Sequence, residues 1–164
     1  VGVTRQRCWQ CDWVVEFDIK GAFDNLDHGL LLKAVRKHTD CRWVLLYVER
    51  WLQAPSITEA GEVKARQRGT PQGGVASPLL SVIYMNRFLK HWRLTGRGEA
   101  FRAHVISYAD DFVILSRGHA DEALTWTRSV MTKLGLTLNE AKTSLNRRVT
   151  VDCAMTCLLL RSGR

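Results

Sequence analysis

Two adjacent aspartates interrupt a run of apolar residues, and this feature constrains the fold more than any other. They are Asp110 and Asp111, in the segment Ser-Tyr-Ala-Asp-Asp-Phe over residues 107–112. The β-branched and apolar residues on both sides predict two strands joined at the Ala-Asp-Asp turn. Neighbouring carboxylates repel each other and resist leaving water, so an unpartnered pair at this position would cost stability.

A third aspartate, Asp18, has similar surroundings, because it follows the apolar segment Trp-Val-Val-Glu-Phe and precedes Gly21. This pattern predicts another strand. If that strand lies beside the hairpin, Asp18 and Asp110 face each other, and two carboxylates so close need a cation between them. Hard oxygen ligands favour Mg²⁺, and two metals ~3.5–4 Å apart are typical of phosphoryl transfer. The acids alone also allow solvated turn residues or a structural salt bridge.

Four other segments have the apolar spacing of amphipathic helices. Asp27 is expected to cap the first helix by accepting a backbone N–H, and Pro55 to limit the second. Ser77 is expected to cap the third, with Pro78 at its first position, and Gly135 to stop the fourth. The expected helices cover residues 28–38, 41–54, 78–94 and 120–135.

The remaining segments are extended or form turns. A polar hairpin is expected around Gly61, and a strand with a turn over residues 136–145. The order of elements predicts an α+β fold of the split-βαβ, ferredoxin-like kind, with an antiparallel sheet and helices packed on one face. A length of 164 residues is enough for one domain with a core.

The net charge and the cysteines limit the partners and the compartment. A formal net charge of +8 favours nucleic acid, because basic side chains displace counterions from phosphates. No apolar run reaches the ~18 residues that span a membrane, so no membrane partner is expected. Five cysteines without a secretory signal indicate reduced thiols in a cytoplasm. A zinc site from Cys8, Cys11, Cys153 and Cys157 is the alternative.

Four segments in order resemble the palm motifs of reverse transcriptases, and together they cover about residues 5 to 145. They read FDIKGAFDNLDH, RGTPQGGVASPLLSVIYMN, SYADDFVIL and LGLTLNEAKT. YADD alone is an unspecific string, whereas all four motifs in this order are a strong signal. The set is most similar to bacterial group II intron-encoded reverse transcriptase–maturases, and GTPQGG with FDIKGAFDNLDH favours this type over retron and diversity-generating enzymes.

The resemblance implies a polymerase palm with RNA-directed DNA polymerase activity. It implies two Mg²⁺ ions, with Mn²⁺ as a substitute, and an RNA template, a DNA primer, dNTPs and intron RNA as partners. It also implies a bacterial cytoplasmic location. The alternative is an RNA-binding maturase fragment that assists intron splicing without its own catalysis. A nucleotide cyclase would need a substrate-loop signature that the sequence lacks.

The resemblance also assigns catalytic roles to individual residues. Asp18 and Asp110 would be metal ligands, with Asp111 as the adjacent, less direct acid. The backbone carbonyl of Ile19 would add an oxygen ligand. Lys142 would protonate or stabilise the departing pyrophosphate, although most lysines are simply solvated surface residues.

Five further residues would contact the substrates. Phe23 would lie under the sugar of the incoming nucleotide and exclude a 2′-hydroxyl, with core packing as the alternative role. Gln72 and Gly73 would lie beneath the templating base pair, where glycine permits a close backbone approach. The small Ala109 would admit the primer end, and Tyr108 would pack under the primer strand.

Two parts of the family pattern have no counterpart in the sequence: the basic fingers region, and the apolar primer grip that precedes the thumb. We therefore expect residues 1–164 to be a single palm domain that lacks most of the fingers and the thumb, with a tail over about residues 150–164 that matches no motif. Because positioning supplies much of the catalysis, we expect the isolated chain to have weak or no activity. The candidates for duplex contacts are Arg5, Arg7, Arg36, Lys37, Arg87, Lys90 and Arg93.

Overall fold

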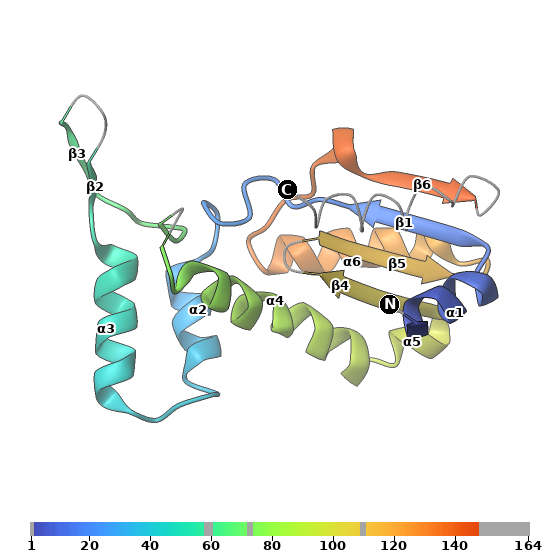
Figure 1. Cartoon of the computed structure of the whole chain (residues 1–164), viewed down its shortest axis with the longest axis horizontal. Coiled ribbons are helices and arrows are strands. Elements are labelled where there is room, and N and C mark those ends of the chain that lie inside the picture. The colour runs from blue at the N-terminus through green and yellow to red at the C-terminus, as the bar shows by residue number, and fades with distance from the viewer. Residues whose placement is uncertain (1, 58–60, 72–73, 109–110, 148–164) are drawn as a thin grey trace.

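A four-stranded antiparallel sheet forms one layer of the protein, in the right half of Figure 1. The computed structural model describes residues 2–57, 61–71, 74–108 and 111–147. The order of the strands across the sheet is β4-β5-β1-β6, so β1 has a neighbour on each side. The strands are β1 (Trp13–Phe17), β4 (Ala103–Tyr108), β5 (Asp111–Ser116) and β6 (Ser144–Arg147).

The pairing of β1 with β5 defines two faces of the sheet, because side chains alternate along a strand. Phe17 and Phe112 are partners in this register, and their rings stack at 5.7 Å in the main core. Val14 and Leu115 are also partners, but they belong to a second, smaller cluster that includes Cys11. The main core therefore lies on one face, and the small cluster lies on the other.

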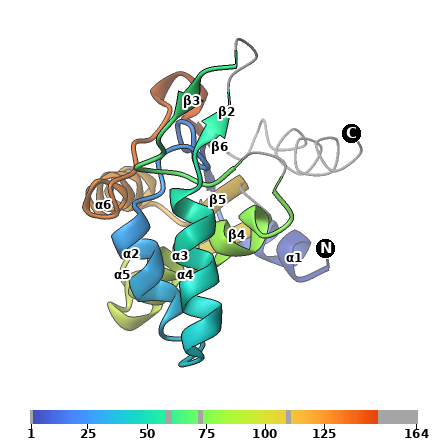
Figure 2. The ribbon, with the colours of Figure 1, turned by 90° about the vertical axis from the view of Figure 1, so that its left-hand side faces the viewer.

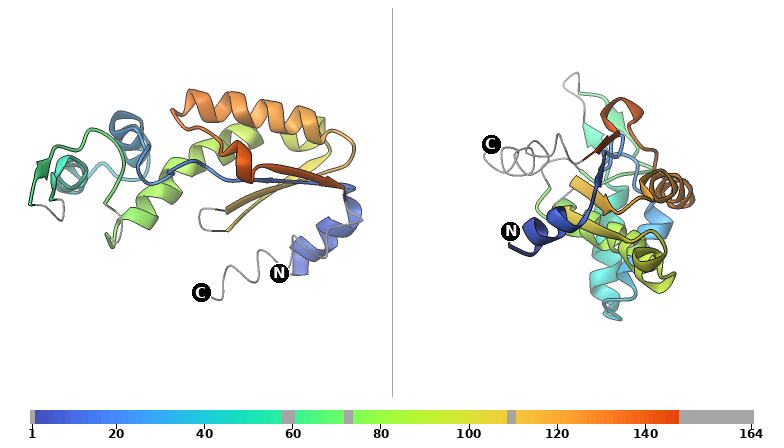
Figure 3. Two further views of the ribbon diagram at one scale, coloured as in Figure 1. Left: turned by 90° about the horizontal axis from the view of Figure 1, so that it is seen from above. Right: turned by 90° about the vertical axis from the view of Figure 1, so that its right-hand side faces the viewer.

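Two long helices cover the face of the main core, as Figure 3 shows. They are α4 (Ser77–Leu94) and α6 (Ala120–Lys133), and the short α5 (Arg97–Ala100) follows α4. Phe88 of α4 is fully buried and packs edge-on against Phe17 and Phe112. The prediction of an α+β sheet with helices on one face is confirmed for this layer.

One helix that the sequence pattern did not predict lies on the opposite face. It is α1 (Gly2–Gln10), and its Cys8 packs against the small cluster of Cys11, Val14, Val113 and Leu115. In Figure 3 the sheet separates α1 from α6. The mostly polar residues of this segment form no apolar stripe at helical spacing, so the sequence did not predict a helix there.

The remaining elements extend from one end of the sheet (Figure 1), the end that faces the viewer in Figure 2. They are α2 (His28–Val35), α3 (Arg42–Gln53) and a hairpin of β2 (Ser56–Ile57) with β3 (Val63–Lys64). The capping prediction at Asp27 is confirmed, because its Oδ1 accepts the Leu30 N–H at 2.8 Å. The helix before Pro55 and the hairpin at Gly61 were also predicted correctly.

One capping prediction is wrong. Ser77 is the first residue of α4 rather than its cap, because Ala76 occupies the cap position and Pro78 is the second helical residue. The Ser77 hydroxyl donates instead to the carbonyl of Pro71, and so it ties α4 to the preceding loop. The predicted stop of α6 is confirmed: Gly135 has φ +71°, a left-handed value that favours glycine.

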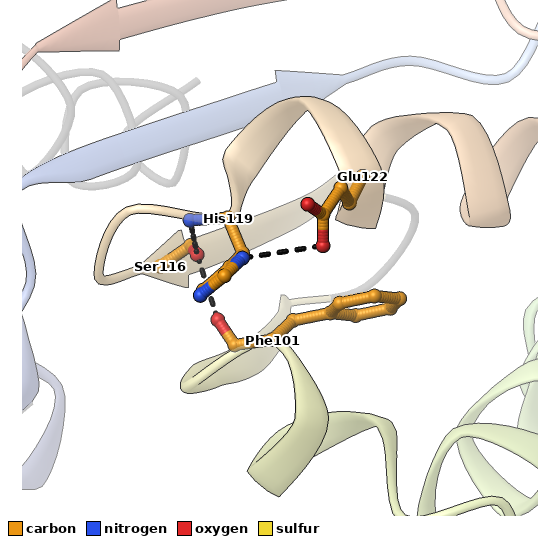
Figure 4. Close-up of polar contacts among 4 residues, drawn as sticks. All are labelled: Phe101, Ser116, His119 and Glu122. Carbon is orange, nitrogen blue, oxygen red and sulfur yellow. Dashed lines mark hydrogen bonds and ion pairs between the residues drawn. The ribbon is translucent and has the colours of Figure 1, made fainter.

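A hydrogen-bonded corner turns the chain from β5 into α6 (Figure 4). The buried Ser116 hydroxyl donates to the Phe101 carbonyl at 2.9 Å and accepts the His119 N–H at 3.3 Å. His119 Nδ1 lies 3.2 Å from a carboxylate oxygen of Glu122. These contacts direct α6 back across the face of the main core. Within the described ranges, no helix has the length and hydropathy of a membrane span.

Candidate active site

Asp18 is held in place by its backbone, directly after β1 ends. The Asn139 N–H donates to the Asp18 carbonyl at 2.8 Å, and Ile19 forms an antiparallel bridge with Leu138. The Lys20 N–H donates a further hydrogen bond to the Thr137 carbonyl at 2.9 Å. The chain around Asp18 is therefore an extension of the sheet and not a free loop.

The alternation of side chains shows which face Asp18 occupies. Phe17 and Ile19 are 3% and 4% exposed, and both belong to the main core under the helices. Asp18 lies between them in extended backbone, so its side chain points to the opposite face. The carboxylate is 30% exposed, which leaves it accessible from solvent.

Lys142 supplies the positive charge at this carboxylate. It is the last residue of a 3₁₀ turn, η1 (Glu140–Lys142), and its Nζ lies 3.2 Å from Asp18 Oδ2. The Asn139 side-chain amide lies 3.5 Å from the same oxygen. Because the lysine side chain is 59% exposed, the ion pair contributes on the order of 1 kcal/mol or less.

A second ion pair anchors this turn to α6. Arg128 donates two hydrogen bonds to the Glu140 carboxylate, at 3.1 Å and 2.8 Å. The hydrogen bond from Arg128 lowers the pKa of Glu140. Sequence reasoning identified Lys142 through the motif but missed Arg128 and Asn139, because only the fold brings α6 and residues 139–142 together.

The register of the sheet places Asp111 next to Asp18. Phe17 and Phe112 are the last described pair of β1 and β5, and one step further along the two strands lie Asp18 and Asp111. The prediction that the strand of Asp18 neighbours the acidic hairpin is confirmed. Tyr108 pairs with Asp111 at the end of β4 and β5.

Several predicted site residues fall outside the described part of the chain. Ala109, Asp110, Gln72 and Gly73 are among them, and so are the side chains of Tyr108 and Asp111. Their roles stay predictions.

Phe23 lies in a loop that is locked to the segment before Gln72. Its carbonyl accepts the Thr70 N–H at 2.7 Å, while the Leu26 carbonyl accepts the Gly69 N–H at 2.8 Å. Gly69 has φ +78°, and a Cβ atom there would lie 2.6 Å from the Phe23 oxygen. The Phe23 side chain is half-buried and, among the described residues, is not part of the main core. This position is compatible with the predicted role under a sugar.

The glycine of the Arg-Gly-Thr-Pro motif thus has a packing role that sequence reasoning missed. A close backbone approach was predicted for Gly73, and Gly69 was expected only as part of a loop. His28 adds a further contact, because its Nε2 lies 2.8 Å from the Gly69 carbonyl. The sequence signal for this packing role is the glycine itself, which directly precedes Thr70 and Pro71.

The cysteines show no zinc centre in the described part of the chain. Cys11 is buried, and burial raises the pKa of its thiol, with Cys8 and Asp12 contributing in the same direction. A protonated thiol is a poor metal ligand. No group of three or more metal-ligating side chains occurs among the described residues, while Cys153 and Cys157 lie outside them.

Four of the basic residues considered for duplex contacts lie away from Asp18. They line a groove formed by helices α2, α4 and α6, on the helix-covered side of the sheet. These four residues are Arg36, Lys37, Arg87 and Lys90.

The sequence matches a known family over most of its length. Residues 3–152 match the family described as reverse transcriptase (RNA-dependent DNA polymerase). The chain is 34% identical over 145 residues to protein YkfC of Escherichia coli (strain K12), which covers 71% of this chain and 36% of that protein. It is 37% identical over 78 residues to the group II intron-encoded protein LtrA of Lactococcus lactis subsp. cremoris, covering 48% of this chain and 13% of that protein.

The fold also resembles solved structures of distant sequence. An apo telomerase from Candida tropicalis, truncated from its C-terminal domain, superposes with a TM-score of 0.67 at 16% identity. The match covers 88% of this chain and 33% of that chain. This likeness shows a shared fold. The chain spans little more than a third, or less, of the length of these relatives.

Proposed function

The chain belongs to the reverse transcriptase (RNA-dependent DNA polymerase) family, among the group II intron-encoded reverse transcriptase–maturases, and we propose that it is the catalytic palm of such a protein. It would transfer nucleotides from dNTPs to a primer 3′ end on an RNA template. The observation that carries the proposal is the position of Asp18. This carboxylate lies on the face opposite α4 and α6, with Lys142 beside it, and Asp18 and Asp111 lie together one register step beyond the Phe17–Phe112 pair.

The residues around Asp18 fit a divalent cation. The proposed ligands are hard oxygens, from the carboxylates of Asp18, Asp110 and Asp111 and from the Ile19 carbonyl, as Mg²⁺ prefers. The only counter-charge described at Asp18 is Lys142, whose exposed ion pair is weak enough for a metal to replace. When bound, two such ions would supply charge neutralisation at the attacking and leaving oxygens.

Lys142 would have a second role during the reaction. Once its Nζ leaves Asp18, the ammonium group is free to neutralise or protonate the departing pyrophosphate. Its backbone is held in place, because the hydrogen bonds between Arg128 and Glu140 fix the 3₁₀ turn that contains Lys142. The lysine therefore stays near the carboxylate in either role.

Phe23 would discriminate between sugars. Its backbone is fixed by the Thr70 N–H and by close packing with Gly69, so the main chain that carries the ring cannot shift without breaking these contacts. A ring carried by this fixed backbone would reject a 2′-hydroxyl by steric exclusion and favour deoxynucleotides.

Primer extension tests this proposal directly. The palm is placed in a full-length protein with fingers and thumb, and extension is measured on an RNA template with Mg²⁺ and dNTPs. Asp110→Asn should reduce the rate at least about 100-fold, since a lost metal ligand removes several kcal/mol of transition-state stabilisation. Asp121→Asn, an exposed acid at the start of α6, is the matched control and should leave extension unchanged.

The second candidate is an RNA-binding chain that assists splicing without its own catalysis. The observation in its favour is the net charge of +8, which supports RNA binding with or without polymerisation. Extension that is unaffected by Asp110→Asn would refute the catalytic proposal. A protein that binds intron RNA but extends no primer would favour the second candidate.

A further inference from the structure

A groove of about 730 Å³ lies on the helix-covered side of the sheet. Its walls come from α2 with the turn that follows it, from the middle and end of α4, and from the last turns of α6. Apolar side chains such as Ala34, Ile83 and Leu134 form part of its lining. The groove is separate from the site at Asp18, which lies on the opposite face.

The lining of this groove carries charge of one sign. Six Lys and Arg residues line it, and no aspartate or glutamate does. Five of the six are exposed, and none of these forms a salt bridge with any other part of the chain that the structure describes. The six are Lys33, Arg36, Lys37, Arg87, Lys90 and Lys133.

Arg87 differs from the other five because it is built into the fold. It is half-buried, its Nη1 donates to the Leu30 carbonyl at 3.1 Å, and its guanidinium lies 5.9 Å from the centre of the Tyr84 ring. Tyr84 is itself fully buried and donates to the Leu134 carbonyl. One positive charge is thus fixed between α2 and α4, and the exposed lysines surround it.

Such a cluster has an energetic cost in the free protein. Like charges on neighbouring elements repel each other, and no acid in the lining of the groove offsets them. A concave surface lined by one sign of charge concentrates its field and attracts ions of the opposite sign. The arrangement becomes favourable when a polyanion occupies the groove.

The spacing of the charges suits a phosphodiester backbone. Residues three or four apart on a helix have Cβ atoms about 5–6 Å apart. Arg87 and Lys90 form one such pair on α4, and Lys33 forms another with Arg36, the residue that caps the C-terminal end of α2. Two short rows of cations therefore flank the groove, and each row can meet neighbouring phosphates of one strand.

We propose that this groove is a second RNA-binding surface, which holds the phosphate backbone of a structured RNA apart from the primer and template at Asp18. The choice of RNA over other polyanions rests on the proposed function. The surface would let the chain hold a folded RNA while the opposite face remains free for nucleotide transfer.

The test measures binding of an RNA hairpin to the 164-residue chain by fluorescence anisotropy, with EDTA and without primer or dNTP. The groove variant is Lys33→Gln, Lys37→Gln, Lys90→Gln and Lys133→Gln. The control variant removes the same charge elsewhere: Arg42→Gln, Arg50→Gln, Lys64→Gln and Arg117→Gln. All eight side chains are exposed, so both variants should fold, which thermal unfolding verifies.

The groove variant should bind the hairpin at least about tenfold more weakly at 0.1 M salt. Its slope of log affinity against log salt should fall by roughly 3 to 4, because each lost phosphate contact removes about 0.9. The control variant should change affinity less than about threefold. Equal weakening in both variants, or none in either, would overturn the proposal.

Two further measurements separate this proposal from its rivals. If the groove variant loses affinity for polyglutamate but keeps its affinity for the hairpin, the groove binds an acidic protein and the RNA proposal is overturned. Asp110→Asn should keep full affinity for the hairpin. Failure of the polymerase proposal therefore appears in primer extension, whereas failure of the groove proposal appears in hairpin binding.

Discussion

Replacing Gly69 with alanine should destabilise the protein and disturb the loop that fixes Phe23. The new Cβ would lie 2.6 Å from the Phe23 carbonyl oxygen and 2.7 Å from both Cα and O of Asp24. All three are backbone atoms, so the chain must move apart. The movement would break the hydrogen bonds that Thr70 and Gly69 donate to Phe23 and Leu26.

The size of the effect is the sum of two costs. A non-glycine residue at φ +78° costs about 1–2 kcal/mol, and each lost hydrogen bond costs about 1 kcal/mol more. The free energy of unfolding should therefore fall by roughly 3–4 kcal/mol. In a chain of this length that corresponds to a decrease in Tm of roughly 10 °C.

Gly61 provides a matched control. Its φ of +80° is nearly the same, but no described atom lies within 4 Å of a Cβ built there. Gly61→Ala should thus cost only the backbone strain, about 1–2 kcal/mol. Urea and thermal unfolding, followed by circular dichroism, compare both variants with the parent protein. If Gly69→Ala costs no more than Gly61→Ala, the close packing of Gly69 against Phe23 contributes nothing and the reasoning is refuted.

Three further predictions concern the site and the sheet. Phe23→Ala should lower the ratio of kcat/KM for dNTPs over NTPs by about 10-fold or more in the full-length protein, and an unchanged ratio would exclude a role in sugar selection. Lys142→Gln should slow primer extension yet tighten Mg²⁺ binding by up to about fivefold in calorimetry, because it removes the cation that competes for Asp18. Weaker Mg²⁺ binding would contradict that competition. Burial lowers the pKa of His104 below 6.5, with Arg7 acting in the same direction. The unfolded chain therefore binds a proton more readily, so stability should fall as the pH decreases through 6.5 toward the lower folded pKa. His104→Gln should reduce this loss in urea unfolding at pH 7.5 and 5.5, and an unaltered pH dependence would contradict the assignment.

Local patterns in the sequence predicted the local structure well. Asp27 caps α2 and Gly135 stops α6 because each depends on a few neighbouring residues. Ser77 was misassigned because its hydroxyl bonds to Pro71, six residues away, in competition with the cap. The helix α1 was not predicted because its apolar residues do not recur at helical spacing.

The candidate site was predictable only in part, because its contacts join distant segments. The motifs identified Asp18 and Lys142, but nothing in their spacing shows that Nζ and Oδ2 lie 3.2 Å apart. The close packing of Gly69 against Phe23 and the hydrogen bonds from Arg128 to Glu140 are likewise visible only in the folded structure. Four of the six basic residues of the groove were candidates for duplex contacts from the sequence, namely Arg36, Lys37, Arg87 and Lys90, whereas the groove itself and the contributions of Lys33 and Lys133 were not predicted.

The central position of β1 has a consequence for the order of folding. Asp18 is bonded to Asn139, which lies 121 residues later in the chain. Contacts of such large sequence separation form slowly, and a nascent chain at the ribosome lacks the Asn139 contacts of Asp18 until residue 139 has been made. The contacts of Asp18 with Asn139 can therefore form only late in synthesis, after most of the sheet has been made.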